Sequence, residues 1–380
     1  MALHADNVTD MSFDYYGLRV ATGSLDRSVK IWQAVAATSG DAPRGADQSE
    51  ERGSSAESGW KLLASWAAHQ GAVLRVAWAP PHACGPGVLA TCGADRKVCV
   101  WEQMSASGTQ WQSLAKLVDA RDEVRGVAFA PSAAGGAGVR VLLAAAAADG
   151  FLRVYEARDL ANLHQWPLVQ ELSTPSAIPL RCVHWCPAAH LSLHASATTA
   201  FVVGGDGPVA YVYAAPPHTS RWQLAAILRQ PEAVNASDLP SDLVVNDVAW
   251  APSVGRNSHF IAVALSSGAV CVFELGADVF WPASAVEAIP CAKLSAHAPH
   301  SAQRVAWNLA GTMLASSDSS GTMRLWTPDD PTFSSWTCIG HVPPPIERND
   351  NGDSGDNAFG AGAAIPASEA AQHAKANIIT

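Results

Sequence analysis

The sequence predicts an all-β fold, a propeller of six four-stranded blades, and three repeated features support this prediction. Six segments, about 50–70 residues apart, follow one plan of four short strands. The first and third strands of each copy end in a large aromatic residue. Most of the 14 tryptophans fall at equivalent places in the copies, which a random distribution would not produce.

The first strand of each copy alternates apolar and polar residues, as a strand with one buried face does. In four copies a proline follows the terminal aromatic residue by two positions, and proline is typical of a strand end. The six segments are VTDMSF, VLRVAW, VRGVAF, LRCVHW, VNDVAW and AQRVAW, ending at Phe13, Trp78, Phe129, Trp185, Trp250 and Trp307.

The remaining strands follow in a constant order. Second strands are small and apolar, as in RVATGS and VLATCG, and a tight turn leads to the third strand. Third strands end at Trp32, Trp101, Tyr155, Tyr213, Phe273 and Trp326. Fourth strands contain or open with Trp60, Trp111, Trp166, Trp222 and Trp336, and the fifth copy is less distinct, within residues 281–294.

The turn before the third strand carries an aspartate in three copies. Asp26, Asp95 and Asp149 each lie six residues before the terminal aromatic residue, where a carboxylate can accept hydrogen bonds from turn N–H groups. His69 and His297 precede first strands, and we expect His69 to bond Asp95. The later copies depart from this pattern: Asp206 is one residue out of register, and Ser267 and Ser320 replace the aspartate.

Composition narrows the classes of function. Hydrophobic residues make up 48% of the chain, charged residues 15%, and the net charge is −10 without a basic run, so sequence-specific or general nucleic-acid binding is not expected. The first ten residues lack the apolar core of a signal peptide, and the apolar run at 141–148 is too short to span a bilayer. Eight scattered cysteines without a disulfide framework favour the cytosol or nucleoplasm.

The predicted propeller covers residues 4–342. A Gly-, Ser- and charge-rich insertion at 37–59 is expected to be a disordered loop within the first blade, and residues 132–138 a loop between strands. Residues 343–380 begin with three prolines and predict a disordered tail, with at most a short helix within 367–377.

Two motifs suggest chemistry, but packing explains them better. Cys182, His184 and Cys186 alternate along one strand, which does not easily surround a tetrahedral zinc ion. The GGDG at 204–207 lacks the lysine and helix of a phosphate-binding loop and predicts a hairpin turn. No nucleophile motif is present, so we expect no enzyme activity, metal or cofactor, and the turn aspartates are interpreted as structural.

Three stretches carry a family resemblance: MSFDYYGLRVATGSLDRSVKIW at 11–32, LRVYEARDLANLHQWPLVQEL at 152–172 and RVAWNLAGTMLASSDSSGTMRLW at 304–326. They resemble the WD-repeat propellers of the coat-nucleoporin class, and within it the Seh-type nucleoporins, over nearly all of residues 4–341. The connection through NLHQW in the third blade is the most specific feature. The related outer-cage propeller of the COPII coat lacks this long connection.

The resemblance implies a structural scaffold. Such propellers are open six-bladed rings in the Y-shaped outer-ring complex of the nuclear pore, completed in trans by a blade from an α-solenoid nucleoporin. The implied partners are this solenoid and other outer-ring nucleoporins, and the implied location is the nuclear envelope. The resemblance further implies a role in a vacuolar or lysosomal coat complex, at the surface of that membrane, that controls nutrient signalling through the TOR pathway.

The strand order agrees with an open ring. The order is a-b-c-d six times, with no strand shared between the first and last blades, so either these blades meet by packing alone or a gap exposes apolar faces. We hypothesise that the flanks of these blades bind the partner. The candidate residues are Val8, Met11, Phe13, Val305, Trp307, Met323 and Leu325.

Two other functional classes stay open at this point. A COPII-type cage propeller is a variant of the scaffold, and a generic WD-repeat adaptor would bind short peptides at the central channel. A propeller hydrolase is disfavoured because no residue can be named as its nucleophile.

Overall fold

The computed structural model describes residues 4–35, 59–85, 87–105, 107–131, 141–159, 162–187, 199–215, 221–230, 243–252, 256, 258–276, 285–295 and 297–344. The expected loops at 37–59 and 132–138 and the expected tail and helix after 343 lie almost wholly outside these residues. The chain divides into two compact units, one of residues 1–132 and 140–171 and the other of residues 133–139 and 172–380. The division falls within one strand, Leu168–Ser173.

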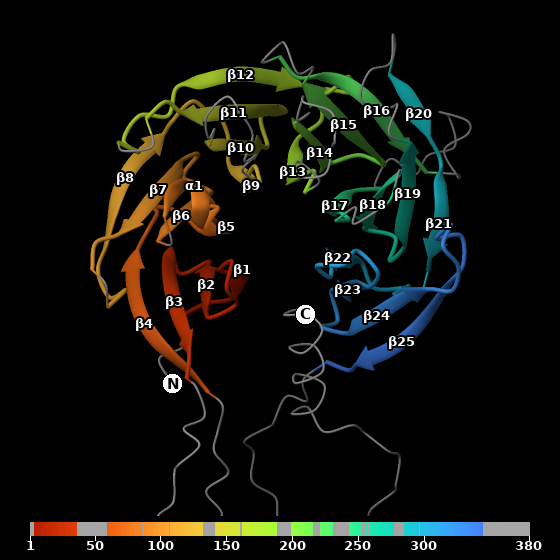
Figure 1. The fold of residues 1–380 in the computed structure, drawn as a ribbon, viewed down its shortest axis with the longest axis horizontal. Helices are drawn as coiled ribbons and strands as arrows, with labels where there is room; N and C mark the ends of the chain where they lie inside the picture. Colours follow the sequence, from red (N-terminus) through yellow and green to blue (C-terminus); the bar gives the residue numbers. More distant parts are fainter. Residues whose placement is uncertain are drawn as a thin grey trace, which may run out of the picture. The chain divides into compact units, whose positions relative to one another are not determined.

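The first unit holds three antiparallel sheets, which we call blades 1 to 3 (Figure 1). Blade 1 consists of β1 (Val8–Phe13), β2 (Arg19–Ser24), β3 (Ser28–Ala34) and β4 (Trp60–Ala67). Blade 2 consists of β5 (Val73–Trp78), β6 (Val88–Gly93), β7 (Val98–Gln103) and β8 (Trp111–Leu117), with α1 (Pro81–Cys84) between its first two strands. Blade 3 consists of β9 (Val124–Phe129), β10 (Val141–Ala147), β11 (Phe151–Ala157) and β12 (Leu168–Ser173).

The second unit holds blades 4 to 6. Blade 4 consists of β13 (Leu180–Trp185), β14 (Thr199–Gly205), β15 (Val209–Ala215) and β16 (Gln223–Arg229). Blade 5 consists of β17 (Val245–Trp250), β18 (Ser258–Leu265), β19 (Val270–Gly276) and β21 (Pro290–Leu294). Blade 6 consists of β22 (Ala302–Trp307), β23 (Leu314–Asp318), β24 (Met323–Pro328) and β25 (Trp336–Val342).

The first strand of every blade, strand a, has the six residues that the sequence pattern predicts. This allows one numbering: position 1 is Val8 in β1 and Val73 in β5, and position 6 is the aromatic residue. In all six blades the pairing with the second strand shifts register between positions 1 and 3, which is a β-bulge. The repeat in the sequence is therefore a repeat in backbone geometry.

Neighbouring blades within a unit pack face to face through apolar side chains. Ala21, Val29 and Ile31 of blade 1 are fully buried in one cluster with Val73 and Val76 of blade 2. In the second unit, Ala262 and Val272 of blade 5 are buried with Val305 and Trp326 of blade 6. Because burial of a large apolar side chain contributes about 1.5–3 kcal/mol, these contacts supply much of the stability of each unit.

The fifth copy, which was indistinct in the sequence, contains an additional strand. The segment predicted to hold one fourth strand forms both β20 (Val286–Ala288) and β21. β20 pairs in parallel with β16, so that blade 4 has five strands (Figure 1). An ion pair of 2.9 Å between Arg229 Nη2 and Glu287 Oε1 accompanies this pairing.

The partly buried ring of His259 predicts a pH-dependent stability. Its Nδ1 accepts a hydrogen bond of 3.4 Å from Trp250 Nε1, and burial lowers the pKa of His259 to about 4. Because the ordinary pKa is about 6.5, the unfolded chain binds this proton first, and the free energy of unfolding should fall by about 1–3 kcal/mol between pH 6.5 and 4. Urea unfolding across this range should show a weaker dependence in His259→Gln, whereas His341→Gln, at an exposed histidine, should behave as the unsubstituted chain. Equal pH dependence in both variants would contradict the prediction.

Candidate partner-binding surfaces

A four-residue hydrogen-bonded network joins strands b and c of blade 2 to the segment before strand a. His69 Nδ1 lies 2.8 Å from Asp95 Oδ1, the pair that the sequence predicts, and His69 Nε2 lies 2.8 Å from Thr91 Oγ1. The same hydroxyl accepts a hydrogen bond of 2.9 Å from Trp101 Nε1. We call this Asp–His–Thr/Ser–Trp set a tetrad, and the blade face that carries it the tetrad face.

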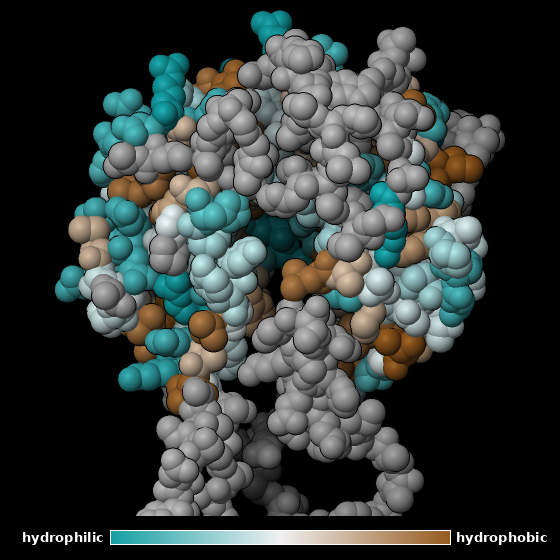
Figure 2. Space-filling model, in the orientation of Figure 1, coloured by the Kyte–Doolittle hydropathy of each residue, from teal (hydrophilic) through white to brown (hydrophobic). Residues whose placement is uncertain are grey.

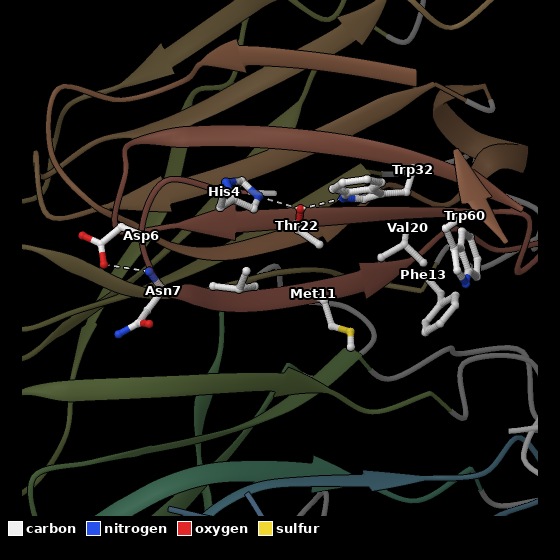
Figure 3. Close-up of a pocket in the computed structure, with 10 residues that line it drawn as sticks. His4, Asp6, Asn7, Met11, Phe13, Val20, Thr22, Trp32 and Trp60 are labelled. Atoms are coloured by element: carbon white, nitrogen blue, oxygen red, sulfur yellow. Dashed lines mark hydrogen bonds between the residues drawn. The ribbon is translucent and has the colours of Figure 1, made fainter. Parts of the chain in front are cut away.

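Blade 1 contains the same tetrad, with a histidine that the sequence reasoning did not identify. His4 Nδ1 lies 2.9 Å from Asp26 Oδ2, and its Nε2 lies 2.8 Å from Thr22 Oγ1, which also accepts from Trp32 Nε1. Figure 3 shows His4, Thr22 and Trp32 in a row joined by these bonds. The signal was available, because His4 precedes Val8 by four residues as His69 precedes Val73.

Blade 6 has a third tetrad, and here the expected residue is corrected. Ser320 does not replace the carboxylate: His297 Nδ1 lies 2.8 Å from Asp318 Oδ2, and Ser320 donates to the other oxygen of Asp318. His297 Nε2 lies 2.6 Å from Ser316 Oγ, which accepts from Trp326 Nε1 at 2.8 Å. The spacing of six residues missed Asp318 because it ends strand b instead of lying in the turn.

Blades 3 to 5 lack the whole tetrad. Their counterparts of Thr22 are Ala145, Val203 and Val263, and Tyr or Phe stands at the position of Trp32 in the third strand. Neither the Thr or Ser hydroxyl nor the indole N–H is therefore present. In blade 3 Asp149 is held instead by Arg153, whose Nη2 lies 2.8 Å from Asp149 Oδ2. The turn aspartates therefore act structurally in two different ways.

The turn carboxylates have lowered pKa values. Burial by itself would raise the pKa of Asp95, but hydrogen bonds from His69, Gln70 N and Lys97 N hold it below the usual range. In the same way, hydrogen bonds from Ser320 and His297 outweigh burial and lower the pKa of Asp318 to about 2. These groups stay ionised at neutral pH, and their contribution to stability should decline as the pH falls below about 4.

Blade 1 has a tetrad face that is not covered by the rest of its unit. Val8 at position 1 is 52% exposed, Met11 at position 4 is 61% exposed, and Phe13 at position 6 is 54% exposed. The counterparts of Val8 in the other blades are at most 1% exposed: Val73, Val124, Leu180, Val245 and Ala302. The counterparts of Met11 are 3–9% exposed: Val76, Val127, Val183, Val248 and Val305.

These exposed residues line an open pocket of about 560 Å³. Phe13 contacts Trp60 edge to face, with ring centroids 5.9 Å apart, and Figure 3 shows the Met11 thioether pointing away from the rest of the blade. Of the polar residues that line the pocket, His4 and Thr22 already belong to the tetrad, and the Asp6 carboxylate accepts a hydrogen bond from the Asn7 backbone N–H. The pocket is therefore suited to apolar side chains of a second blade. The full lining is His4, Asp6, Asn7, Val8, Met11, Phe13, Val20, Thr22, Trp32 and Trp60.

Blade 6 has the complementary property: its face opposite the tetrad face is not covered by the rest of its unit. Met323 is 46% exposed, and Leu325 is half-buried. Their counterparts in blade 1 are Val29 and Ile31, both fully buried against blade 2. The other counterparts of Met323 are at most 1% exposed: Val98, Leu152, Ala210 and Val270.

Two of the seven candidate residues lie elsewhere. Val305 is buried, and its backbone N–H donates to Asp247 Oδ2 of blade 5 at 3.2 Å. Trp307 is half-buried, and its Nε1 donates to the Ala249 carbonyl at 3.1 Å. Both side chains thus pack against blade 5. The structure places Val8, Met11, Phe13, Met323 and Leu325 on the two uncovered faces.

Other surfaces of the described residues give less indication of a binding site. Figure 2 shows apolar side chains in small groups among hydrophilic ones, which is usual for protein surfaces. Blade 1 differs because three exposed apolar residues, Val8, Met11 and Phe13, lie together on one blade face. The eight cysteines form no disulfide. Within the described ranges no cluster of His, Cys, Asp or Glu could hold a metal ion, and Cys182 and Cys186 are buried side chains. No helix in the described part of the chain is long and apolar enough to cross a bilayer.

Six sheets, each built on four antiparallel strands and three of them with tetrads, define a WD-repeat β-propeller protein. A sequence model of the WD domain, G-beta repeat, matches residues 2–33, 60–102 and 289–327, and these three ranges contain the three tetrads. Curated relatives cover most of the chain. Nucleoporin SEH1-A of Xenopus laevis is 33% identical over 89% of this chain and 85% of its own, and nucleoporin SEH1 of Homo sapiens is 31% identical over the same shares. Nucleoporin SEH1 of Danio rerio is 32% identical over 96% of this chain and 91% of its own. The chain belongs to the SEH1 nucleoporin family.

Proposed function

We propose that the chain is a non-catalytic scaffold subunit of the outer-ring complex of the nuclear pore, where it associates with other nucleoporins and supports nucleocytoplasmic transport. Family membership supports this role, because the curated relatives are named nucleoporins. No metal-holding cluster occurs in the described residues, and the turn aspartates are engaged in structural networks.

The exposed tetrad face of blade 1 is the observation that most directly supports the proposed mode of assembly. It leaves uncovered three apolar side chains whose counterparts in other blades are mostly buried, and blade 6 leaves its opposite face uncovered. We infer that a blade donated by an α-solenoid nucleoporin packs against these uncovered apolar surfaces. Donation of strands by a partner is an established way to complete a sheet protein.

Substitution of Met11 by glutamate tests this proposal. The change places a charge on the proposed binding surface, where binding would leave it buried without a partner. We expect Met11→Glu to weaken binding to the full-length solenoid nucleoporin of the same organism by at least a hundredfold, and to leave the melting temperature of the isolated chain within about 2 °C, because Met11 is exposed. Co-purification and calorimetric titration measure the binding.

A matched control is Val118→Glu, at an equally exposed apolar residue outside the pocket; it should leave binding unchanged. The proposal would be wrong if Met11→Glu bound the solenoid as tightly as the unsubstituted chain, or if the solenoid left the thermal stability of the chain unchanged.

The same surfaces are available to a second assembly. We infer that a vacuolar or lysosomal coat complex acting on TOR signalling recruits the chain through the same two faces, so that its binding and that of the nuclear pore solenoid are mutually exclusive. Affinity purification from cells should then recover both sets of partners with the unsubstituted chain and neither with Met11→Glu. Recovery of COPII cage components would favour a COPII-type cage propeller, and recovery only of proteins that bind through short peptides would favour a generic peptide-binding WD-repeat adaptor.

A further inference from the structure

The two units contain blade junctions that show what a covering blade must provide. At the junction of blades 1 and 2, the position-1 residue Val73 packs against Gly23, which lies in strand b of the preceding blade. A Cβ atom added to Gly23 would lie 2.7 Å from Val73 Cγ1 and 3.1 Å from Val76 Cγ1. Real Cβ atoms do not approach so closely, so the position-1 side chain occupies the space of a missing side chain.

The junction of blades 4 and 5 repeats this arrangement independently in the other unit. A Cβ atom added to Gly204 would lie 2.3 Å from Cγ1 of Val245, the position-1 residue of blade 5. Gly23 and Gly204 occupy the same register, opposite position 3 of strand a. The residue in this register is small in every blade: Gly23, Cys92, Ala146, Gly204, Ala264 and Ser317.

A polar contact accompanies the apolar one at two junctions. Thr9, at position 2 of blade 1, donates its hydroxyl to the Val73 carbonyl at 2.6 Å. Asn246, at position 2 of blade 5, donates its side-chain amide to the Ala302 carbonyl at 2.8 Å. In both cases the receiving carbonyl belongs to position 1 of the following blade.

Val8 is the position-1 residue of blade 1, and it is exposed on the uncovered face. Because its backbone register matches that of Val73 and Val245, its side chain and carbonyl present the same two features to a covering blade. A partner that packs against Val8 must therefore leave room for the position-1 side chain, as Gly23 of blade 1 and Gly204 of blade 4 do.

We propose that the strand pair that covers blade 1 carries glycine, or a residue no larger than serine or cysteine, against the Val8 side chain, and a serine, threonine or asparagine that donates to the Val8 carbonyl. This inference rests on the proposed blade donation and specifies its chemistry. The partner is thus defined by a small residue at one position, which a general apolar surface would not require.

A compensating pair of substitutions tests the small residue. The full-length chain and the full-length solenoid nucleoporin of the same organism are co-purified, and Val8→Cys identifies the partner residue nearest to position 8 by disulfide capture in a cysteine scan of the inserted strands. The partner residue captured most efficiently should be small. Its replacement by valine should weaken binding at least tenfold, and Val8→Ala should restore binding to within about threefold of the original.

The outcomes separate the two proposals. Capture of a large residue opposite Val8, or unchanged binding after the replacement by valine, would overturn the small-residue inference while leaving blade donation intact if Met11→Glu still abolishes binding. Absence of capture together with normal binding of Met11→Glu would overturn both. Val8→Ala alone, at an exposed side chain, should keep the melting temperature of the isolated chain and controls for misfolding.

Discussion

Leucine at position 204 is expected to destabilise the protein strongly, whereas leucine at position 317, in the same register of another blade, should not. Gly204 faces Val245 of the next blade, and any added side chain would overlap it. Overpacking of this kind costs typically about 1–3 kcal/mol and occasionally more, so Gly204→Leu should lower the free energy of unfolding by about 3 kcal/mol. Ser317 belongs to the uncovered face of blade 6 and is only partly buried, so Ser317→Leu should change it by less than about 0.5 kcal/mol.

Urea unfolding of the isolated chain measures both effects, and binding to the solenoid nucleoporin gives a second readout. Ser317→Leu should weaken that binding at least tenfold, since the proposed donated blade would place its own position-1 residue at Ser317. Equal destabilisation by the two substitutions would show that blade 6 is covered in the isolated chain and would contradict the proposed mode of assembly.

Removal of the Asp95 carboxylate should have the next largest effect on stability. Asp95 accepts hydrogen bonds from His69 and from the backbone N–H groups of Gln70 and Lys97, and the His69 ring is buried. Asp95→Ala leaves these donors without an acceptor, which costs about 1–3 kcal/mol for each buried group left unsatisfied. We expect a loss of about 2–3 kcal/mol in thermal or urea unfolding, and a smaller additional loss when His69→Ala is added, because the two residues form one network.

Ser267→Ala is the matched control, because Ser267 lies at the same spacing in blade 5, is exposed and belongs to a blade without a tetrad. It should cost less than about 0.5 kcal/mol. Full additivity of Asp95→Ala and His69→Ala would mean that the hydrogen bond between them contributes nothing to stability. The lowered pKa of Asp95 adds a second check: Asp95→Ala should also lose less stability than the unsubstituted chain as the pH falls from about 4.

The regular part of the fold could be predicted from the sequence because one pattern is repeated. All six first strands have the predicted bounds, from Val8–Phe13 to Ala302–Trp307, since alternation and a terminal aromatic residue define both their register and their ends. The bond between His69 and Asp95 followed from position in the same repeat. The extra strand β20 could not be predicted, because its three residues carry no alternation of their own and are held by pairing with β16.

The candidate surface was predicted only in part, for a physical reason. A strand pattern shows which residues share a face, but it does not show which of the two neighbouring blades that face contacts. Val305 and Met11 occupy the same position in their blades, yet blade 5 covers Val305 and nothing in the first unit covers Met11. Exposure had to be compared position by position across the blades before the uncovered faces could be separated from the buried ones.

The pairing of β20 with β16 has a consequence for how the protein is made. Blade 4 receives its fifth strand from a segment that lies between the third and fourth strands of blade 5. During translation, the outer edge of β16 therefore remains unpaired until residues 286–288 have left the ribosome. A stalled or truncated chain that ends after β16 would expose this edge to other nascent chains. The second unit should accordingly complete its folding late in synthesis, with blades 4 and 5 forming together instead of one after the other.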